Sequence, residues 1–245
     1  MKIAVFGNSH ITALKLGWPP TSLAAPTFFG APGQSVRGSL VDQDGIVPAN
    51  ADVADYFRMT SGGLDRLLFK NYDAVWLVGL STGIFRFMGP LRKHRLFNNN
   101  ASTLPLMSRA AFEACTFGTE KALTFDTLAK QIRAVSNIPI TVVPDPMPSE
   151  NILSCPKEGY VWKPPYAPEA LERFQNWTRK LASNGLTVVH QPLATLREGW
   201  LTKSEFSEGS KKLLGDLTHA HDEDEYFHMN ARYGALVVAE AMRMS

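Results

Sequence analysis

Two segments near opposite ends of the chain carry the side chains that a serine nucleophile requires. The first is MKIAVFGNSH, in which Ser9 follows an apolar run, and the second is HDEDEYFHMNARYG, which contains His228. A nucleophilic serine needs an imidazole to accept its proton, and the imidazole needs a carboxylate to orient it and stabilise its charge. Glu225 and Asp224 precede His228 closely enough for one loop to supply both base and acid. These residue types predict acyl chemistry at Ser9, provided that folding brings the two segments together.

The surroundings of Ser9 also allow a structural interpretation. The run Ile3 to Phe6 has the character of a buried strand, and Gly7 lets the chain turn at its carboxyl end, the edge where ligands bind in open α/β sheets. Serine is a favoured N-cap residue, so Ser9 either reacts at this edge or caps the helix that follows. His10 comes directly after Ser9, and we expect its ring to serve packing rather than catalysis.

The GNSH segment and the EYFHMN segment together resemble the SGNH (GDSL-type) hydrolase superfamily, whose members carry Gly-Asp-Ser in the first block and Asp-x-x-His in the last. The resemblance spans the order and spacing of the whole chain. It implies Ser9 as nucleophile, His228 as general base and Glu225 as acid. Asn8 and Glu225 stand where the family usually has Asp, so Asp224 remains an alternative acid.

The resemblance also implies an oxyanion hole with one altered member. The family's second block supplies a glycine, for which GAPGQSV offers Gly33, with Gly30 as the lesser candidate. The third block, usually Gly-x-Asn-Asp, is Gly-Leu-Ser-Thr here, so Ser81 replaces the amide donor. The loss of one oxyanion donor can cost about 10²- to 10³-fold in turnover. The hole then rests on the Ser9 and Gly33 amides, with or without the Ser81 hydroxyl, or the activity is weak.

Ser81 is also a rival nucleophile. It lies in Gly-Leu-Ser-Thr-Gly after a strand, the pattern of the α/β-hydrolase elbow, and Asp145 with His190 or His228 would complete its triad. That fold normally places several strands and a glycine-rich oxyanion segment before the elbow, whereas only two strands are expected here. The sequence therefore favours Ser9.

Five short runs with strand character alternate with segments of helical periodicity, which is typical of a parallel sheet covered on both faces. The expected strands are Ile3–Phe6, Thr27–Phe29, Ala74–Val78, Ile140–Val143 and Leu186–His190. This pattern predicts an α/β fold: a three-layer α/β/α, flavodoxin-like doubly wound parallel sheet of about five strands. Asp44-Gly45 predicts a small β-hairpin between the second and third strands.

Apolar residues at helical spacing predict the covering helices. Pro168 and Gly185 suit the first turn and the C-terminal stop of the helix before the fifth strand. The apolar sets are Leu64, Leu67 and Leu68 before the third strand; Leu128, Ile132 and Val135 before the fourth; Leu171, Phe174, Trp177 and Leu181 before the fifth; and Leu236, Val237, Ala239 and Ala241 in a last helix from about Asn230 to Met242.

The composition is that of an ordinary globular protein. Of 245 residues, 44% are hydrophobic and 20% are charged, and the formal net charge is +2. We expect one domain over residues 1–245, with no nucleic-acid and no membrane partner. Cys115 and Cys155 form no disulfide framework and are typical of free thiols in a reducing compartment. The first apolar run is too short for a signal peptide and no run is long enough for a membrane helix, so we expect a cytoplasmic location.

The basic segment RFMGPLRKHRLFNNN belongs to an insertion at about residues 83–105, which we expect on the same sheet edge as Ser9. Its cations, with Arg86 and Arg92 foremost, form either a solvated lid or a surface that attracts an anionic substrate. With Asn8 and His10 they are the predicted substrate-binding residues. The apolar side chains expected to line an acyl or ring pocket are Phe85, Phe87, Met88 and Phe97.

The predicted function is that of a serine esterase that hydrolyses an O-acyl ester through a covalent acyl-enzyme. The basic insertion favours a polar substrate, with carbohydrate esters first. An O-acyltransferase would use the same triad, and a non-catalytic ligand-binding module would follow if the altered third block marks a lost oxyanion hole. His219 and His221 lie among acids, but no helical His-x-x-x-His pair is present, so we expect no metal and no organic cofactor.

Overall fold

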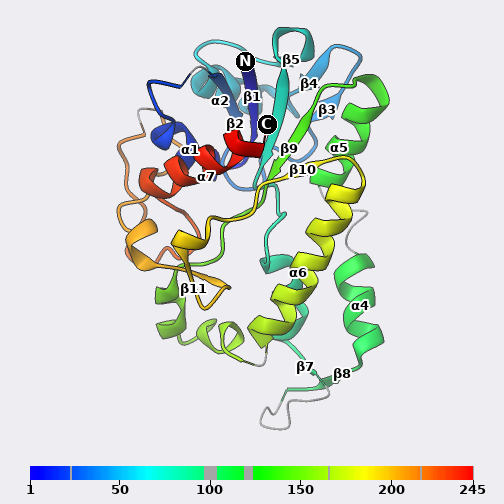
Figure 1. Cartoon of the computed structure of the whole chain (residues 1–245), viewed down its shortest axis with the longest axis vertical. Helices are drawn as coiled ribbons and strands as arrows, with labels where there is room; N and C mark the ends of the chain where they lie inside the picture. The colour runs from blue at the N-terminus through cyan, green and yellow to red at the C-terminus, as the bar shows by residue number, and fades with distance from the viewer. Residues whose placement is uncertain (23, 97–103, 119–123, 165, 216, 245) are drawn as a thin grey trace.

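The computed structural model describes the chain except residues 23, 97–103, 119–123, 165, 216 and 245. Its centre is a sheet of five parallel strands in the order β10-β9-β6-β1-β2 (Figure 1). The prediction of five strands is confirmed, and the fifth is shorter than expected. The strands are β1 (Lys2–Gly7), β2 (Ala25–Gly30), β6 (Ala74–Val78), β9 (Ile140–Val143) and β10 (Thr187–Val188).

The strand order creates a topological switch point between β1 and β6. The sheet grows from β1 to β2 on one side and from β6 through β9 to β10 on the other, which is the flavodoxin order. At such a point the loops that leave the carboxyl ends of the two central strands diverge and open a crevice where ligands bind. Residues 8–10 after β1 and residues 79–83 after β6 flank this point, so the topology marks the surroundings of Ser9 as the expected site.

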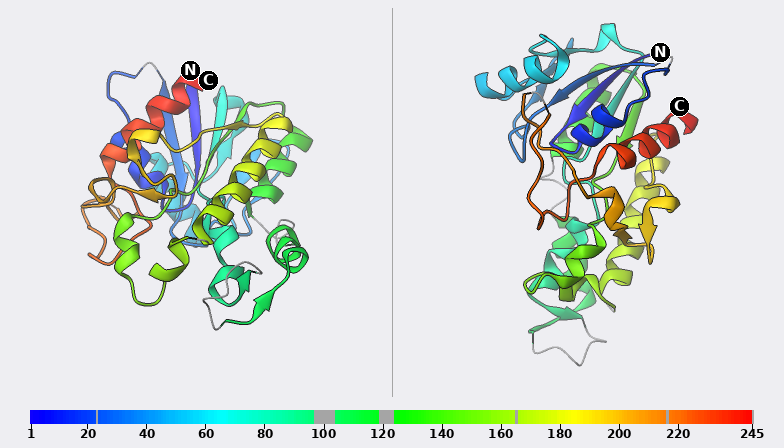
Figure 2. Two further views of the ribbon diagram at one scale, coloured as in Figure 1. Left: turned by 60° about the horizontal axis from the view of Figure 1, so that its bottom comes forward. Right: turned by 90° about the vertical axis from the view of Figure 1, so that its left-hand side faces the viewer.

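Two helical layers cover the sheet, and the alternation of side chains along β1 assigns its faces. Ala4 and Phe6 belong to one core cluster, whereas Ile3 and Val5 belong to another. The predicted three-layer architecture is therefore confirmed, with α6 and α7 on opposite sides of the sheet (Figure 2). The helices packed on the first face are α2 (Ala51–Ser61), α5 (Thr124–Val135) and α6 (Tyr166–Ser183), and those on the second are α1 (Ile11–Gly17) and α7 (Ala231–Met244).

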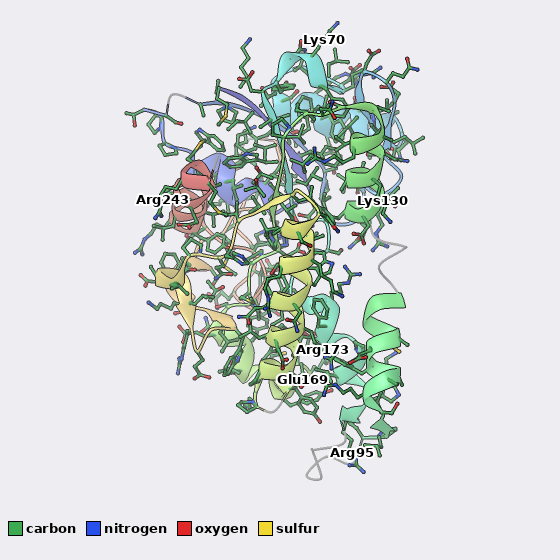
Figure 3. All side chains as sticks on the ribbon, turned by 45° about the vertical axis from the view of Figure 1, so that its right-hand side comes forward. Lys70, Arg95, Lys130, Glu169, Arg173 and Arg243 are labelled. Carbon is green, nitrogen blue, oxygen red and sulfur yellow. The ribbon has the colours of Figure 1, made fainter. Side chains whose placement is uncertain are left out.

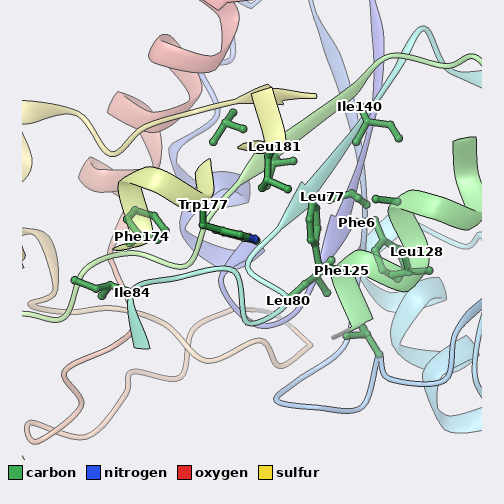
Figure 4. Close-up of a cluster of buried hydrophobic side chains, with 14 of the residues drawn as sticks. Phe6, Leu77, Leu80, Ile84, Phe125, Leu128, Ile140, Phe174, Trp177 and Leu181 are labelled. Carbon is green, nitrogen blue, oxygen red and sulfur yellow. The ribbon is translucent and has the colours of Figure 1, made fainter. Parts of the chain in front are cut away.

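The larger core fills the space between the sheet and the helices α5 and α6. Phe6 and Leu77 of the strands gather with Leu128 of α5 and with Trp177 and Leu181 of α6 (Figure 4). None of these five side chains is more than 7% exposed. Burial of a large apolar side chain contributes about 1.5 to 3 kcal/mol, so this cluster holds the two helices firmly on the sheet.

The segment before β6 is a strand where a helix was predicted. Leu67 and Leu68 form β5 (Leu67–Leu68), which pairs with β4 (Gly45–Val47) of the hairpin that begins at β3 (Leu40–Val41). A Cβ on Gly45 would lie 1.8 Å from the Leu67 carbonyl oxygen, so glycine permits this close pairing, which overrides the helical spacing of the leucines. The hairpin at Asp44-Gly45 is confirmed.

Helix α2 precedes β5 and was not predicted. Asn50 caps its first turn, because the Asn50 side chain accepts the Val53 N–H at 3.0 Å. Gly62 ends the helix with a φ of 83°, a conformation that suits glycine at a C-terminus.

The prediction for the last helix is right in extent and partly wrong in its buried face. Val237 and Ala241 are 1% and 0% exposed, but Leu236 is 37% exposed and Ala239 also faces solvent. Residues three or four apart share a helix face, and positions 236 and 239 fall outside that face. Val135 of α5 is likewise 41% exposed. The other buried residues of α7 are Tyr233, Gly234 and Val238.

The segment after β6 forms a helical lobe with α6. It contains α3 (Phe85–Met88), the 3-10 turn η2 (Pro90–Arg92) and β7 (Arg95–Leu96), which pairs with β8 (Leu106–Met107) before α4 (Arg109–Gly118). Phe87 and Met88 are fully buried, and Phe87 packs against the rings of α6, so these two side chains do not line an open pocket as predicted. Phe97 lies outside the described residues.

Arg173 joins α4 to α6 within this lobe. Its guanidinium binds Glu169 at 2.6 Å and Glu113 of α4 at 3.5 Å, and it covers the Phe112 ring at 4.6 Å. Figure 3 shows Arg173 and Glu169 close together on α6. Within the described residues, no helix is long and apolar enough to cross a membrane.

Candidate active site

The segment after β1 presents the Ser9 hydroxyl at the edge of the sheet. A Cβ on Gly7 would lie 2.2 Å from the Val78 carbonyl oxygen, so glycine allows β1 to end against β6. Helix α1 then begins with His10 at its N-cap and with no capping side chain, so the interpretation of Ser9 as a helix cap is wrong. Ser9 Oγ instead lies 2.7 Å from Nε2 of His228, 219 positions away in the chain.

Asn230 fixes the loop that carries His228. Its Nδ2 donates to the carbonyl oxygens of Glu205 and Glu208 at 2.8 and 2.9 Å. Its Oδ1 accepts the Tyr233 N–H at 3.2 Å, in the first turn of α7. Asn230 therefore both caps the last helix and ties down the loop before it.

Helices α1 and α7 meet through two glycines. A Cβ on Gly234 would lie 1.8 Å from the Ala13 carbonyl oxygen, and one on Gly17 would lie 2.3 Å from the Ala231 carbonyl oxygen. Helix α1 follows the Ser9 segment and α7 follows the His228 loop. This backbone-to-backbone packing, built from residues without reactive groups, therefore sets the separation of the two segments.

Glu225 is the carboxylate beside His228. Glu225 Oε1 lies 3.3 Å from Nδ1 of His228 while it accepts the Phe227 N–H at 2.6 Å. The contact with Nδ1 is longer than the about 2.7–2.9 Å of a strong charge-assisted hydrogen bond. Burial opposes ionisation of Glu225, but His228 and the Phe227 N–H outweigh it and lower the pKa of Glu225 to about 2. Asp224 is exposed, so of the two candidate acids only Glu225 contacts the imidazole.

The environment of His228 favours its neutral form. Burial, helped by the proximity of His10, lowers the pKa of His228 below its ordinary value of 6.5, although Glu225 and Asp145 act in the opposite direction. A neutral imidazole whose Nε2 faces a hydroxyl can accept the hydroxyl proton, which is the state a general base requires.

A second carboxylate–imidazole pair lies next to the first. His10 Nε2 is 3.1 Å from Asp145 Oδ1, and Asp145 Oδ2 accepts the Gly83 N–H at 2.8 Å. Asn8 also bonds to Asp145, and Asn8 Oδ1 accepts the His10 N–H at 3.2 Å. Burial opposes ionisation of Asp145, but these contacts hold the pKa of its carboxyl below the usual value. Asn8 is 9% exposed and joins the loops after β1 and β9, so it is not open to substrate as predicted.

Three imidazole rings form a stack centred on His228. The His10 and His228 centroids are 4.9 Å apart with planes at 27°, and those of His221 and His228 are 4.1 Å apart at 16°. Burial and the proximity of His228 lower the pKa of His221 to about 4. His221 is therefore neutral over most of the pH range in which His228 can act as a base.

His221, Glu225 and His228 offer ligand atoms that lie within 4.8 Å of one another. Histidine and carboxylate are zinc ligands. A ring nitrogen, however, coordinates along its lone pair in the plane of the ring, and two nearly parallel rings at 16° direct their lone pairs side by side. Both rings would have to turn before they could hold one ion, so the observed geometry fits a ring stack better than a metal centre.

The turn after β6 has a strained backbone. Leu80 and Ser81 have φ values of 60° and 62°, and the Thr82 N–H closes the turn on the Gly79 carbonyl oxygen at 3.2 Å. A non-glycine residue reaches this left-handed region at a cost of about 1 to 2 kcal/mol. A Cβ on Gly79 would lie 2.2 Å from Asn8 Oδ1, so the turn packs directly against the Ser9 segment. Backbone strain of this kind clusters at functional sites.

Three amide groups at this sheet edge are free to bind a ligand. Gly33 is exposed in the loop after β2 with a φ of 56°, and its N–H, like those of Ser9 and Ser81, donates to no group within the described residues. Gly30 donates its N–H to Thr60 Oγ1 at 3.1 Å, so it cannot serve as the oxyanion donor that it was considered for.

The rival triad around Ser81 is not assembled. Asp145, its proposed acid, pairs with His10, and His190 is exposed. In the part of the chain that the structure describes, no histidine makes a hydrogen bond to Ser81.

Of the two cationic side chains predicted to bind substrate, the structure describes that of Arg86. The Arg86 guanidinium lies over the Trp177 ring at 5.2 Å, so it packs α3 on α6. The side chain of Arg92 lies outside the described residues. A role for either side chain in substrate binding stays a prediction.

Two contacts of the site were not anticipated from the sequence. In the first, Asp145 pairs with His10, and in the second, the His221 ring stacks on His228. The first contact joins loops that are distant in the chain, whereas the second lies within the loop before α7, and neither belongs to a spaced motif. One available signal is that His10, His221 and His228, three of the six histidines, all lie in the two segments that carry the predicted triad.

Comparison with known proteins adds little to this geometry. No family profile matches the chain, and no curated protein matches it. The chain is similar to the solved structure of a GDSL-like lipase from Bacteroides thetaiotaomicron, with 12% sequence identity and a TM-score of 0.40 over 99% of this chain and 86% of that chain. The fold class rests on the sheet topology itself, and the site rests on its own contacts.

Proposed function

We propose that this protein is a serine esterase that hydrolyses an O-acyl ester through a covalent intermediate on Ser9. The observation that carries the proposal is the 2.7 Å contact between Ser9 Oγ and His228 Nε2. Glu225 follows at 3.3 Å from Nδ1 of the same ring. The order hydroxyl, imidazole, carboxylate is the arrangement that activates serine for acyl transfer.

In the first half-reaction His228 accepts the Ser9 proton while Oγ attacks the ester carbonyl carbon. Glu225 stabilises the imidazolium, and the Ser9 and Gly33 amides, assisted by Ser81, stabilise the oxyanion. The imidazolium then gives its proton to the leaving alcohol oxygen as the ester C–O bond breaks. In the second half-reaction His228 deprotonates a water, which attacks the acyl carbon, and Ser9 leaves with the proton as the acid is released.

The strained turn after β6 supports a role for Ser81 in the oxyanion hole. The strain at Leu80 and Ser81 is maintained by packing against the Ser9 segment, and it leaves the Ser81 N–H without an acceptor among the described residues. Donors that are already oriented stabilise a developing oxyanion without reorganisation during the reaction. A backbone donor here would offset the missing side-chain amide.

We propose esters of small acyl groups on polar molecules, O-acetylated sugars first, as substrates. The small cavity that touches both Ser9 and His228 is not lined by Gly33 or Ser81, so it does not mark where the acyl group would lie. Hydrolysis rates of p-nitrophenyl esters of increasing chain length would measure the acyl preference.

Fluorophosphonate labelling and p-nitrophenyl acetate hydrolysis test the proposal. We expect labelling at Ser9 in the wild type, and loss of hydrolysis by about 10⁴- to 10⁶-fold in Ser9→Ala and His228→Ala, as in other serine triads. Ser35→Ala, which removes an exposed serine of the same sheet edge, is the matched control and should retain hydrolysis. Labelling at Ser81, or persistent hydrolysis by folded Ser9→Ala, would contradict the proposal. A folded wild type that is neither labelled nor active would instead favour a binding module.

A further inference from the structure

Glu225 by itself holds the His228 ring loosely. The carboxylate is fixed by the Phe227 N–H at 2.6 Å, and its 3.3 Å contact with Nδ1 is longer than the about 2.7–2.9 Å of a strong charge-assisted hydrogen bond. In a serine triad the acid normally fixes the orientation of the imidazole through that bond. The orientation of His228 toward Ser9 therefore depends on other contacts.

His10 and His221 cover the two faces of the His228 ring. Each outer ring is nearly parallel to it, at centroid distances of 4.9 and 4.1 Å. Two rings stacked on the same face of His228 at these distances would contact each other, and the described residues include no such contact, so we infer that His10 and His221 lie on opposite faces. A ring that is covered on both faces cannot rotate about its Cβ–Cγ bond without a clash, so its edge stays directed at Ser9.

The His10 ring is anchored directly, whereas His221 is held through its backbone and by burial of its side chain. His10 is held by Asp145 at 3.1 Å, and Asp145 is held in turn by the Gly83 N–H at 2.8 Å. The His221 backbone N–H donates to the Ser210 carbonyl oxygen at 2.9 Å, and the His221 side chain is 12% exposed. The stack is thus fixed at one end by the loop after β9 and at the other by the loop before α7.

We propose that His10 and His221 are positioning residues that clamp the imidazole of His228 between them and keep its Nε2 directed at Ser9 through both proton transfers. This inference deepens the proposed function and rests on it. It explains how His228 stays directed at Ser9 although its contact with Glu225 is long.

The charges around the stack suit a base that becomes charged during the reaction. An imidazolium at His228 would repel a charged neighbour, and burial keeps His221 neutral by lowering its pKa to about 4. On the other face, the Asp145 carboxylate lies next to His10 and offsets positive charge there. The titratable groups that face His221 are Glu225 and Lys212. Those that face His228 are Glu225, Asp145, His10 and His221, and Lys211 lines the cavity beside it.

Kinetics of His221 variants provide the first test. His221→Ala removes one wall of the clamp, and we expect kcat to fall by about 10- to 100-fold with KM little changed, because a misplacement of about 1 Å can cost about 100-fold. His221→Phe keeps a flat ring without a titrating nitrogen and should restore most of kcat. His219→Ala changes an exposed side chain of the same loop and serves as the control. A His221→Ala enzyme with wild-type kcat would overturn the proposal, as would a folded His221→Phe enzyme as slow as His221→Ala.

The His10 wall needs a paired design, because removal of His10 alone would leave Asp145 buried with an unpaired charge. His10→Phe and His10→Ala are therefore compared in an Asp145→Asn background. We expect the Phe double variant to exceed the Ala double variant in kcat by about tenfold, on the same positional argument. Equal rates in two folded double variants would remove His10 from the clamp.

Histidine NMR separates failure of the clamp from failure of the proposed function, because it needs no turnover. The six imidazoles can be titrated in Ser9→Ala protein with and without His221→Ala or His221→Phe. We expect the pKa of His228 to rise toward 6.5 in the His221→Ala form, since water reaches the exposed face, and to stay low in the His221→Phe form. An unchanged His228 titration in the His221→Ala form would refute the clamp even if the protein is an active esterase. If the pKa of His228 rises as expected in the His221→Ala form but the wild-type protein hydrolyses no ester, the proposed function is refuted and the clamp is supported.

Discussion

Substitution of Gly234 by Ala tests whether the packing of α1 on α7 sets the reactive geometry. The added Cβ would lie 1.8 Å from the Ala13 carbonyl oxygen, where contacts below 3.0 Å are essentially never seen. This oxygen belongs to the backbone of α1, so the two helices must separate by more than about 1 Å. A misplacement of about 1 Å can cost about 100-fold in rate. We therefore expect the Ser9–His228 contact to lengthen and kcat to fall by about 100-fold, or about 2.7 kcal/mol in activation free energy.

The same substitution has opposing effects on stability. Alanine in a helix interior is favoured over glycine by up to about 1 kcal/mol, whereas overpacking costs about 1 to 3 kcal/mol. We expect a small net loss in the free energy of unfolding. Urea denaturation measures it, and fluorophosphonate labelling of Ser9 measures the site. Ala239→Gly, at an exposed position of the same helix, is the control that loses stability without losing labelling. Full labelling of a folded Gly234→Ala protein would refute the reasoning.

The remaining predictions concern the acid, the oxyanion hole and pH. Glu225→Gln should lower kcat by up to about 10⁴-fold in ester hydrolysis, whereas Asp224→Asn should leave it nearly unchanged; the reverse ranking would reassign the acid. Ser81→Asn restores a side-chain amide at a φ that Asn tolerates better, so kcat and the unfolding midpoint should both rise, and a fall in both would count against the turn as an oxyanion element. Because the pKa of His228 lies below 6.5, kcat/KM should hold as the pH drops below 6.5 and fall only through the lowered pKa; a midpoint at or above 6.5 would speak against its buried, neutral state. The pKa of His221 is about 4 in the folded protein and about 6.5 in the unfolded chain, so the unfolded state binds more protons between these pH values. The free energy of unfolding should therefore fall as the pH drops from 6.5 to 4, and the unfolding midpoint measured across this range checks it.

The sequence was sufficient for the sheet because its strands are buried on both faces. Ala74–Val78 is a continuous apolar run, and Ile140–Val143 is apolar except for the buried Thr141. The structure has strands with these bounds. The type of very short elements is harder to predict from the sequence. Leu67 and Leu68 fit a helix and a strand equally well, and their pairing with β4 decides between them.

The site likewise has contacts that the sequence predicts and contacts that it does not. The contact of Ser9 with His228 agrees with the two segments singled out from the sequence, since each has the residue types that the reaction needs. The partnership of His10 with Asp145 depends on the loop after β9 returning beside the loop after β1, which no local pattern encodes. Asn8 was predicted to contact substrate because it is a polar residue at the ligand-binding edge, but its side chain joins two loops instead.

The distance in sequence between Ser9 and His228 has a consequence for biosynthesis. Ser9 is translated before four of the five sheet strands, and His228 only after all of them. A nascent chain that stalls before residue 228 would carry the serine without its base and would be inert toward esters. Onset of turnover in a cell-free translation reaction would thus report the docking of the last helix.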